Sequence, residues 1–141
     1  MNALRKARAA RIEDRAEVVL GCDTVVSLDG VIYGKPADEL QAMSTLQALA
    51  GRTHEVVSGL ALLLAGDERT AVARTEVSFR ELEPATLDWY VGLGEWRERA
   101  GGYAIQGAGA ALVRSIAGDY ENVVGLPLAG LLDLYPELLR H

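Results

Sequence analysis

The stretch EVVSGLALLLAGDERTAVARTEVSFREL, residues 55–82, contains two long segments with the composition of β-strands. Apolar and β-branched residues dominate residues 55–64 and residues 70–82. The four residues between them, Ala65-Gly66-Asp67-Glu68, are typical of a hairpin loop. The sequence therefore predicts that these two strands pair in an antiparallel hairpin.

A second apolar, β-branched stretch lies upstream, at residues 17–27. The Asp29-Gly30 pair that follows has the turn chemistry of a short hairpin, so residues 31–33 should return as a strand. Residues 3–16 are rich in Ala and Arg and contain no Gly or Pro. This composition predicts an N-terminal helix with a charged, solvent-facing side.

Helices are predicted between and after these strands. Asp38 can cap a helix that ends near Gly51, and Pro84 and Pro127 each open a further helix. The apolar positions of the first of these helices recur every three residues, at Leu40, Met43, Leu46 and Leu49. One more strand is predicted at residues 110–116. Helices and strands mix without strict alternation, which favours an α/β domain with a mixed sheet.

Length and composition fit one globular domain covering residues 1–141. The chain has 141 residues, of which 50% are hydrophobic and 24% charged, so it can bury a core and is not disordered. Its net charge of -6 argues against non-specific binding to nucleic acid or to anionic membranes. Any anionic ligand must therefore be held by a local site.

The single cysteine, Cys22, excludes an internal disulfide and a cysteine-based metal site. We expect it to be a small buried strand residue rather than a reactive thiol. The longest apolar run, residues 60–65, is much shorter than the roughly 20 residues of a membrane-spanning helix. No signal peptide is recognisable. The expected location is the cytoplasm.

Asp23 and Thr24 place a carboxylate and a hydroxyl inside an otherwise apolar strand. A buried carboxylate must be paired, hydrogen-bonded or bound to a metal. Asp23 could satisfy a neighbouring backbone amide or could belong to a functional site, and both interpretations stay open from this segment alone.

Two further segments can bring polar groups to a ligand. Lys35, in Gly34-Lys35-Pro36, could reach back toward the Asp23 strand or could be an exposed lysine beside a turn. Residues 101–109 are glycine-rich, which allows the backbone to approach a ligand closely. The amide of Gln106 both donates and accepts, so it suits reading a base edge; its alternative role is to close its own loop.

Histidine and serine chemistry finds no support. His54 has no His or Cys companion at ligand spacing, which argues against zinc, and we expect it to be a structural hydrogen-bonding residue at a strand start. None of the serines lies in a Gly-x-Ser-x-Gly motif, which argues against a serine hydrolase.

Five motifs follow one another along the chain. They are Gly21-Cys22-Asp23-Thr24-Val25-Val26; Gly34-Lys35-Pro36; Gly51-Arg52-Thr53-His54-Glu55-Val56 with Ser58-Gly59; Ala100-Gly101-Gly102-Tyr103-Ala104-Ile105-Gln106-Gly107; and Gly118-Asp119-Tyr120 with Asn122-Val123-Val124-Gly125-Leu126-Pro127-Leu128. Together they resemble the Maf family of nucleoside triphosphate pyrophosphatases. The resemblance spans essentially the whole chain.

The resemblance implies an elongated, strongly twisted mixed sheet flanked by helices, similar to that of the inosine-triphosphate pyrophosphatases. It implies hydrolysis of a nucleoside triphosphate between the α and β phosphates with a divalent metal such as magnesium. Asp23 is the expected metal ligand and catalytic residue. Lys6 and Lys35, the only two lysines, are the expected phosphate ligands. The Asp23-Thr24 pair and Gln106 resemble those of the family branch that acts on dTTP and UTP, whereas the sister branch prefers 7-methyl-GTP. Thr24 and Gln106 are therefore the expected determinants of base selectivity. A homodimer is compatible with this reading.

The start of the chain departs from the family pattern. Family members begin with a strand and a Ser-x-Ser-Pro-Arg-Arg loop that contacts phosphates, whereas this chain opens on the helix in which Lys6-Ala7 matches the family's Lys-Ala. It therefore resembles an N-terminally truncated member, in which the lost strand would leave a sheet edge unpaired. The alternative function is a catalytically impaired binding or regulatory protein linked to septum formation.

Overall fold

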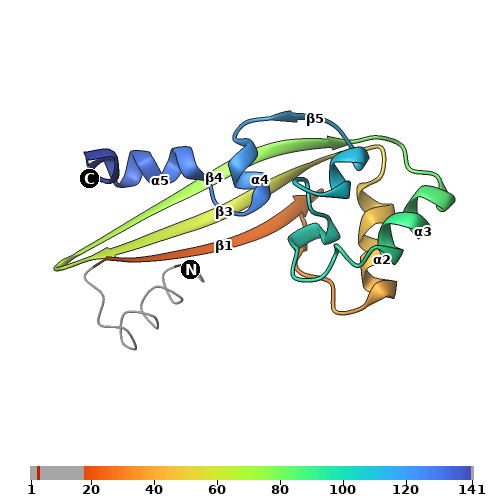
Figure 1. Cartoon of the computed structure of the whole chain (residues 1–141), viewed down its shortest axis with the longest axis horizontal. Helices are drawn as coiled ribbons and strands as arrows, with labels where there is room; N and C mark the ends of the chain where they lie inside the picture. The colour runs from red at the N-terminus through yellow and green to blue at the C-terminus, as the bar shows by residue number, and fades with distance from the viewer. Residues whose placement is uncertain (1–2, 4–17, 141) are drawn as a thin grey trace.

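The computed structural model describes residue 3 and residues 18–140 of the chain (Figure 1). Residues 4–16 of the helix predicted at residues 3–16, and with them the predicted phosphate ligand Lys6, lie outside the described residues. Five strands form one sheet in the order β2-β1-β3-β4-β5. Their bounds are Val19–Leu28 for β1, Val31–Tyr33 for β2, Thr53–Leu64 for β3, Asp67–Phe79 for β4 and Val113–Ala117 for β5.

The long hairpin of β3 and β4 forms the centre of an elongated, twisted sheet (Figure 1). The strands pair antiparallel from Thr53 opposite Ser78 to Leu64 opposite Asp67, as predicted. The turn is shorter than predicted, because Asp67 already belongs to β4. Only Ala65 and Gly66 connect the strands, and Gly66 takes the left-handed conformation (φ 74°) that such a turn requires.

The predicted hairpin between β1 and β2 is also confirmed. Asp29 (φ 50°) and Gly30 (φ 78°) are both left-handed, as in a two-residue hairpin turn. All pairings among the described strands are antiparallel, so the parallel pairing of the expected mixed sheet does not occur there. The reason is connectivity: β1–β2 and β3–β4 are hairpins, and no helical crossover joins parallel neighbours in the described region. The α/β class is confirmed.

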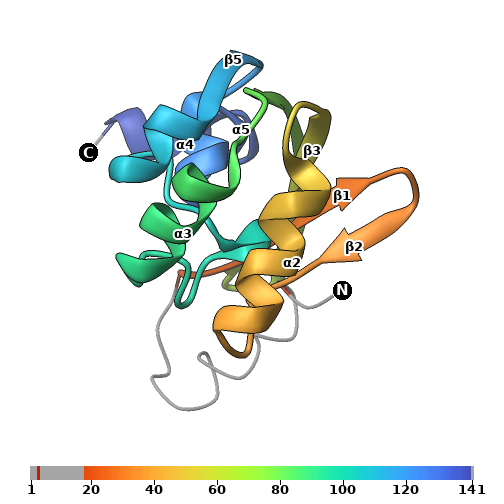
Figure 2. The ribbon, with the colours of Figure 1, turned by 90° about the vertical axis from the view of Figure 1, so that its right-hand side faces the viewer.

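Helices α2 (Glu39–Leu49) and α3 (Pro84–Gly92) lie side by side at one end of the sheet (Figure 2). Asp38 caps α2 as predicted, its side chain accepting a hydrogen bond from the Gln41 amide at 2.8 Å. The predicted apolar spacing is wrong at Leu40, which is 83% exposed. Leu40 precedes Leu49 by about two and a half turns and so faces the opposite side of the helix. The buried residues of α2 are Ala42, Thr45, Leu46 and Leu49.

The C-terminal third differs most from the prediction. Residues 108–112 form a 3₁₀ helix, so the strand expected from residue 110 begins only at Val113. Helix α4 (Tyr120–Val124) was not predicted; Asp119 caps it by accepting a hydrogen bond from the Glu121 amide at 2.9 Å. Helix α5 (Leu128–Leu134) follows Pro127, as expected. In the described part of the chain, no helix has the length and apolarity needed to cross a membrane.

Candidate active site

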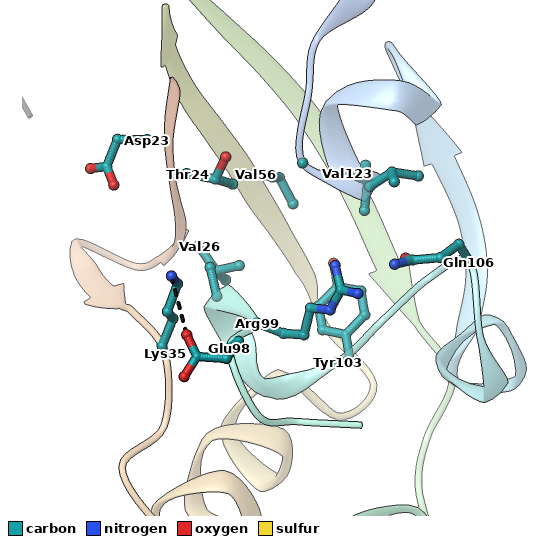
Figure 3. Close-up of a pocket in the computed structure, with 13 residues that line it drawn as sticks. Asp23, Thr24, Val26, Lys35, Val56, Glu98, Arg99, Tyr103, Gln106 and Val123 are labelled. Atoms are coloured by element: carbon teal, nitrogen blue, oxygen red, sulfur yellow. Dashed lines mark ion pairs between the residues drawn. The ribbon is translucent and has the colours of Figure 1, made fainter. Parts of the chain in front are cut away.

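A pocket of about 170 Å³ lies beside strand β1, against the glycine-rich segment (Figure 3). Four residues singled out from the sequence line it together: Asp23, Thr24, Lys35 and Gln106. The other lining residues are Val26, Val56, Glu98, Arg99, Ala100, Tyr103, Val123, Val124 and Gly125. Segments far apart in the sequence thus meet at one site.

Asp23 and Thr24 lie on opposite sides of β1, because successive side chains of a strand alternate (Figure 3). The Thr24 hydroxyl is 2.8 Å from the hydroxyl of Ser58, its register partner on β3. Ser58 is fully buried. A hydroxyl both donates and accepts, so Thr24 keeps hydrogen-bonding capacity for a ligand while Ser58 fixes its position.

Cys22, a residue of β1, contacts a residue of the pocket lining through its thiol. It is half-buried rather than buried as expected, and its thiol donates to the carbonyl of Gly125 at 3.4 Å. Gly125 follows helix α4 and lines the pocket. The thiol therefore ties the end of α4 to the strand that carries Asp23 and Thr24.

Lys35 lines the pocket from the loop after β2, although its side chain is also largely exposed. Its Nζ lies 3.6 Å from Oε2 of Glu98, and the two side chains are 60% and 87% exposed. The backbone there is also tied to the glycine-rich segment, since the Gly101 amide donates to the Gly34 carbonyl at 3.1 Å. An exposed ion pair contributes little stability, so Lys35 can exchange Glu98 for an anionic ligand at small cost.

The glycine-rich segment passes very close to β1. Gly101 is left-handed (φ 74°), and a Cβ there would lie 2.7 Å from Cγ2 of Val26. Gln106 is exposed, and its amide extends into the pocket (Figure 3). Within the described residues, this amide makes no hydrogen bond to its own loop. Closing the loop is therefore the task of other groups.

Tyr103, which lines the pocket, forms a buried hydrogen-bonded pair with His54. The hydroxyl of Tyr103 is 2.7 Å from Nε2 of His54, and the two residues are 5% and 1% exposed. Burial lowers the pKa of His54 to about 4 and raises the pKa of Tyr103, so both are neutral near pH 7. The prediction that His54 is a structural hydrogen-bonding residue at a strand start is confirmed.

Sequence reasoning missed Arg99, whose guanidinium occupies the middle of the pocket (Figure 3). The one sequence feature that could have indicated Arg99 is its position directly before the motif Ala100–Gly107. The described lining carries two cations, Arg99 and Lys35, and two carboxylates, Asp23 and Glu98. Valine side chains supply apolar walls. Such a lining can bind a ligand that combines anionic groups with a flat, partly apolar part.

These features define an α/β protein with a mixed polar and apolar ligand pocket at the side of its sheet. The family model described as "Maf-like protein" matches residues 1–138. The chain belongs to the Maf family, as its five motifs predicted.

Curated relatives are similar over most of the chain. It is 49% identical over 126 residues to the dTTP/UTP pyrophosphatase of Symbiobacterium thermophilum, covering 89% of this chain and 65% of the relative. It is 44% identical over 133 residues to the dTTP/UTP pyrophosphatase of Pyrococcus furiosus, covering 94% and 70%. For the dTTP/UTP pyrophosphatase of Bacillus cytotoxicus the identity is 46% over 130 residues, covering 92% and 68%. The chain thus spans about two thirds of the length of these relatives.

Proposed function

We propose that this chain is a nucleoside triphosphate pyrophosphatase that hydrolyses dTTP and UTP to the monophosphate and pyrophosphate. One observation carries the proposal: the described residues assigned to catalysis, phosphate binding and base selectivity all line one pocket. The similarity to relatives named dTTP/UTP pyrophosphatase supports the substrate class.

The cationic side chains of the pocket suit a triphosphate. The chain has a net charge of -6, so phosphate binding depends on local cations. Lys35 and Arg99 supply two of these, and we assign Lys6, outside the described residues, to the same role. Arg99 can bind a phosphate or a base carbonyl through its planar set of donors.

The donor set of the pocket fits magnesium brought in with the substrate. Mg²⁺ is commonly held by one or two carboxylates together with substrate phosphates and waters. Asp23 would hold it, with the triphosphate completing the ligands; the described residues contain no cluster of three acidic, His or Cys ligands for an all-protein site. When bound, the ion supplies neutralisation of phosphate charge and a more acidic water.

The chain's own residues then carry the reaction. Asp23 accepts a proton from the water that attacks the α phosphorus. A bond forms between the water oxygen and the α phosphorus, the bond from that phosphorus to the bridging oxygen breaks, and pyrophosphate leaves. Lys35 stabilises the negative charge that the leaving group gains. Thr24 and Gln106 address the O4 and N3–H edge that thymine and uracil share.

The test is pyrophosphate release from dTTP, UTP, CTP and 7-methyl-GTP at saturating magnesium. We expect dTTP and UTP to be preferred over CTP, because cytosine reverses donor and acceptor at the recognised edge and leaves the site's groups unpaired. A flat profile, or a preference for 7-methyl-GTP, contradicts the substrate assignment. Nucleotide binding without hydrolysis favours the regulatory alternative linked to septum formation. Cytoplasmic location and a homodimer stay predictions.

A further inference from the structure

The loop that carries Gln106 is held from behind by a carboxylate outside the pocket lining. Glu95, in the turn after α3, accepts hydrogen bonds from two backbone amides at the C-terminal end of this loop, residues 104–109, where the 3₁₀ helix of residues 108–112 begins. Its Oε2 is 3.0 Å from the amide nitrogen of Ala108, and its Oε1 is 3.2 Å from that of Gly109. Glu95 therefore fixes the C-terminal side of the loop.

Tyr90 extends the same network to the N-terminal side of the loop. Its hydroxyl accepts a hydrogen bond from the Ala104 amide at 2.9 Å and donates to Oε1 of Glu95 at 3.0 Å. Tyr90 belongs to α3 and is fully buried. Both flanks of Gln106 are thus attached to α3 and to the turn that follows it, while the Gln106 side chain between them extends into the pocket.

Close packing restricts the backbone conformations that this loop can adopt. A Cβ at Gly107 would lie 2.7 Å from Oε2 of Glu95, and a Cβ at Gly109 would lie 2.3 Å from the Ala104 carbonyl oxygen. The hydrogen bond from the Ala108 amide lowers the pKa of Glu95, so the carboxylate stays ionised at neutral pH. Hydrogen bonds to an ionised acceptor are stronger than neutral ones.

We propose that Glu95 is a positioning residue for base selectivity, which holds the loop of residues 104–109 so that the Gln106 amide meets the base in one orientation. The inference rests on the proposed function. A fixed amide rejects a base with reversed donors and acceptors because its own groups are left unpaired. A loosened loop lets the amide turn and accept either pattern.

The first test measures the loop itself and needs no nucleotide. Amide hydrogen exchange is compared in the wild type, in Glu95→Gln and in Glu83→Gln. Glu83 matches the charge change, is exposed and makes no side-chain cap to α3. We expect exchange at Ala108 and Gly109 to become about tenfold faster in Glu95→Gln only, since more frequent local opening exposes these amides. Unchanged exchange in Glu95→Gln overturns the proposal.

The second test separates positioning from a general structural role. The ratio of kcat/KM for dTTP to that for CTP is measured in the wild type, Glu95→Gln, Gln106→Ala and the double variant. We expect each single variant to lower the ratio by about tenfold, and the double variant to lower it no further than Gln106→Ala. A merely structural defect lowers both rates and leaves the ratio unchanged.

The outcomes distinguish this proposal from the proposed function. The positioning role is overturned, and the proposed function is not, by either of two results. One is an unchanged dTTP-to-CTP ratio in an active Glu95→Gln variant, and the other is a double variant in which the losses in this ratio from the two single variants add. A wild-type chain that binds dTTP without hydrolysing it contradicts the activity, and the ratio of dissociation constants for dTTP and CTP then decides the positioning role. Glu95→Asp, which retains the charge on a shorter side chain, replaces Glu95→Gln if that variant does not fold, with the same expectation.

Discussion

The two ends of the pocket are built in different ways. At one end, Lys35 and Glu98 meet across 3.6 Å with most of their side-chain surface in water. At the other, Thr24 lies 2.8 Å from the buried Ser58, and Tyr103 lies 2.7 Å from the buried His54. Exposed charges can be re-paired at little cost, whereas buried polar groups lose much when a partner is removed. Under the proposed function, the first end would bind the flexible phosphates and the second would select the rigid base.

The largest effect is expected at Asp23. Under the proposed function Asp23 accepts the water proton, so Asp23→Asn should lower pyrophosphate release from dTTP by roughly a hundredfold to ten-thousandfold. The matched control is Asp29→Asn, an exposed hairpin-turn residue outside the pocket. Its turnover should equal that of the wild type. An Asp23→Asn variant with wild-type turnover would be incompatible with this role.

The buried end predicts a pH-dependent stability. The pKa of His54 is lowered from 6.5 to about 4 in the folded chain, so only the unfolded chain takes up this proton between those values. The contribution of neutral His54 to the free energy of unfolding, roughly 3 kcal/mol, is therefore fully present above pH 6.5 and is lost as the pH falls toward 4. Urea unfolding at several pH values measures it.

His54→Gln provides the comparison for that measurement, because glutamine does not titrate. The wild type and the variant should differ in the slope of unfolding free energy against pH between 6.5 and 4, with the steeper slope in the wild type. Equal slopes would show that His54 is not held neutral by burial.

Lys35→Ala tests the exposed end. Losing one charged contact to phosphate should raise KM for dTTP by about tenfold, while the free energy of unfolding changes by less than about 1 kcal/mol. Arg114→Ala is the control, since it removes an exposed cation outside the pocket. If Lys35→Ala leaves both turnover and affinity unchanged, the phosphate assignment is wrong.

The smallest effect is expected for Thr24→Val, which leaves the buried Ser58 hydroxyl without its partner. This should cost about 1 kcal/mol of unfolding free energy and reduce the preference for dTTP over CTP. Thr24→Ser should restore both. Thr70→Val, at an exposed position on β4, controls for strand propensity. A Thr24→Val variant that matches the wild type in both measurements would contradict the comparison.

Local chemistry explains which parts of the fold could be predicted. The Asp29-Gly30 turn and the Asp38 cap act on their immediate neighbours, so the sequence predicts the hairpin and the start of α2 correctly. Helix α4 could not be predicted, because its valines suit a strand and its residue Asn122 is held by distant groups. The Asn122 amide donates to the Val56 carbonyl and to the Thr75 hydroxyl on the neighbouring strands.

The candidate site divides in the same manner. The motifs pointed to Asp23, Thr24, Lys35 and Gln106, which line one pocket, although their roles stay predictions. The network around Glu95 could not be predicted, because its partners are backbone amides, which every residue carries alike. Nothing in the side chains of Ala108 and Gly109 indicates that their amides face a carboxylate.

The alternation of side chains along β1 has a consequence for how this site can diverge. Asp23 and Thr24 are neighbours in the chain but lie on opposite sides of the strand. A substitution at position 24 changes the pocket lining on one side of the strand and leaves the Asp23 carboxylate on the other side unchanged. Adjacent codons thus encode side chains on separate sides of the strand, so under the proposed function a mutation at codon 24 can change base preference without altering the carboxylate.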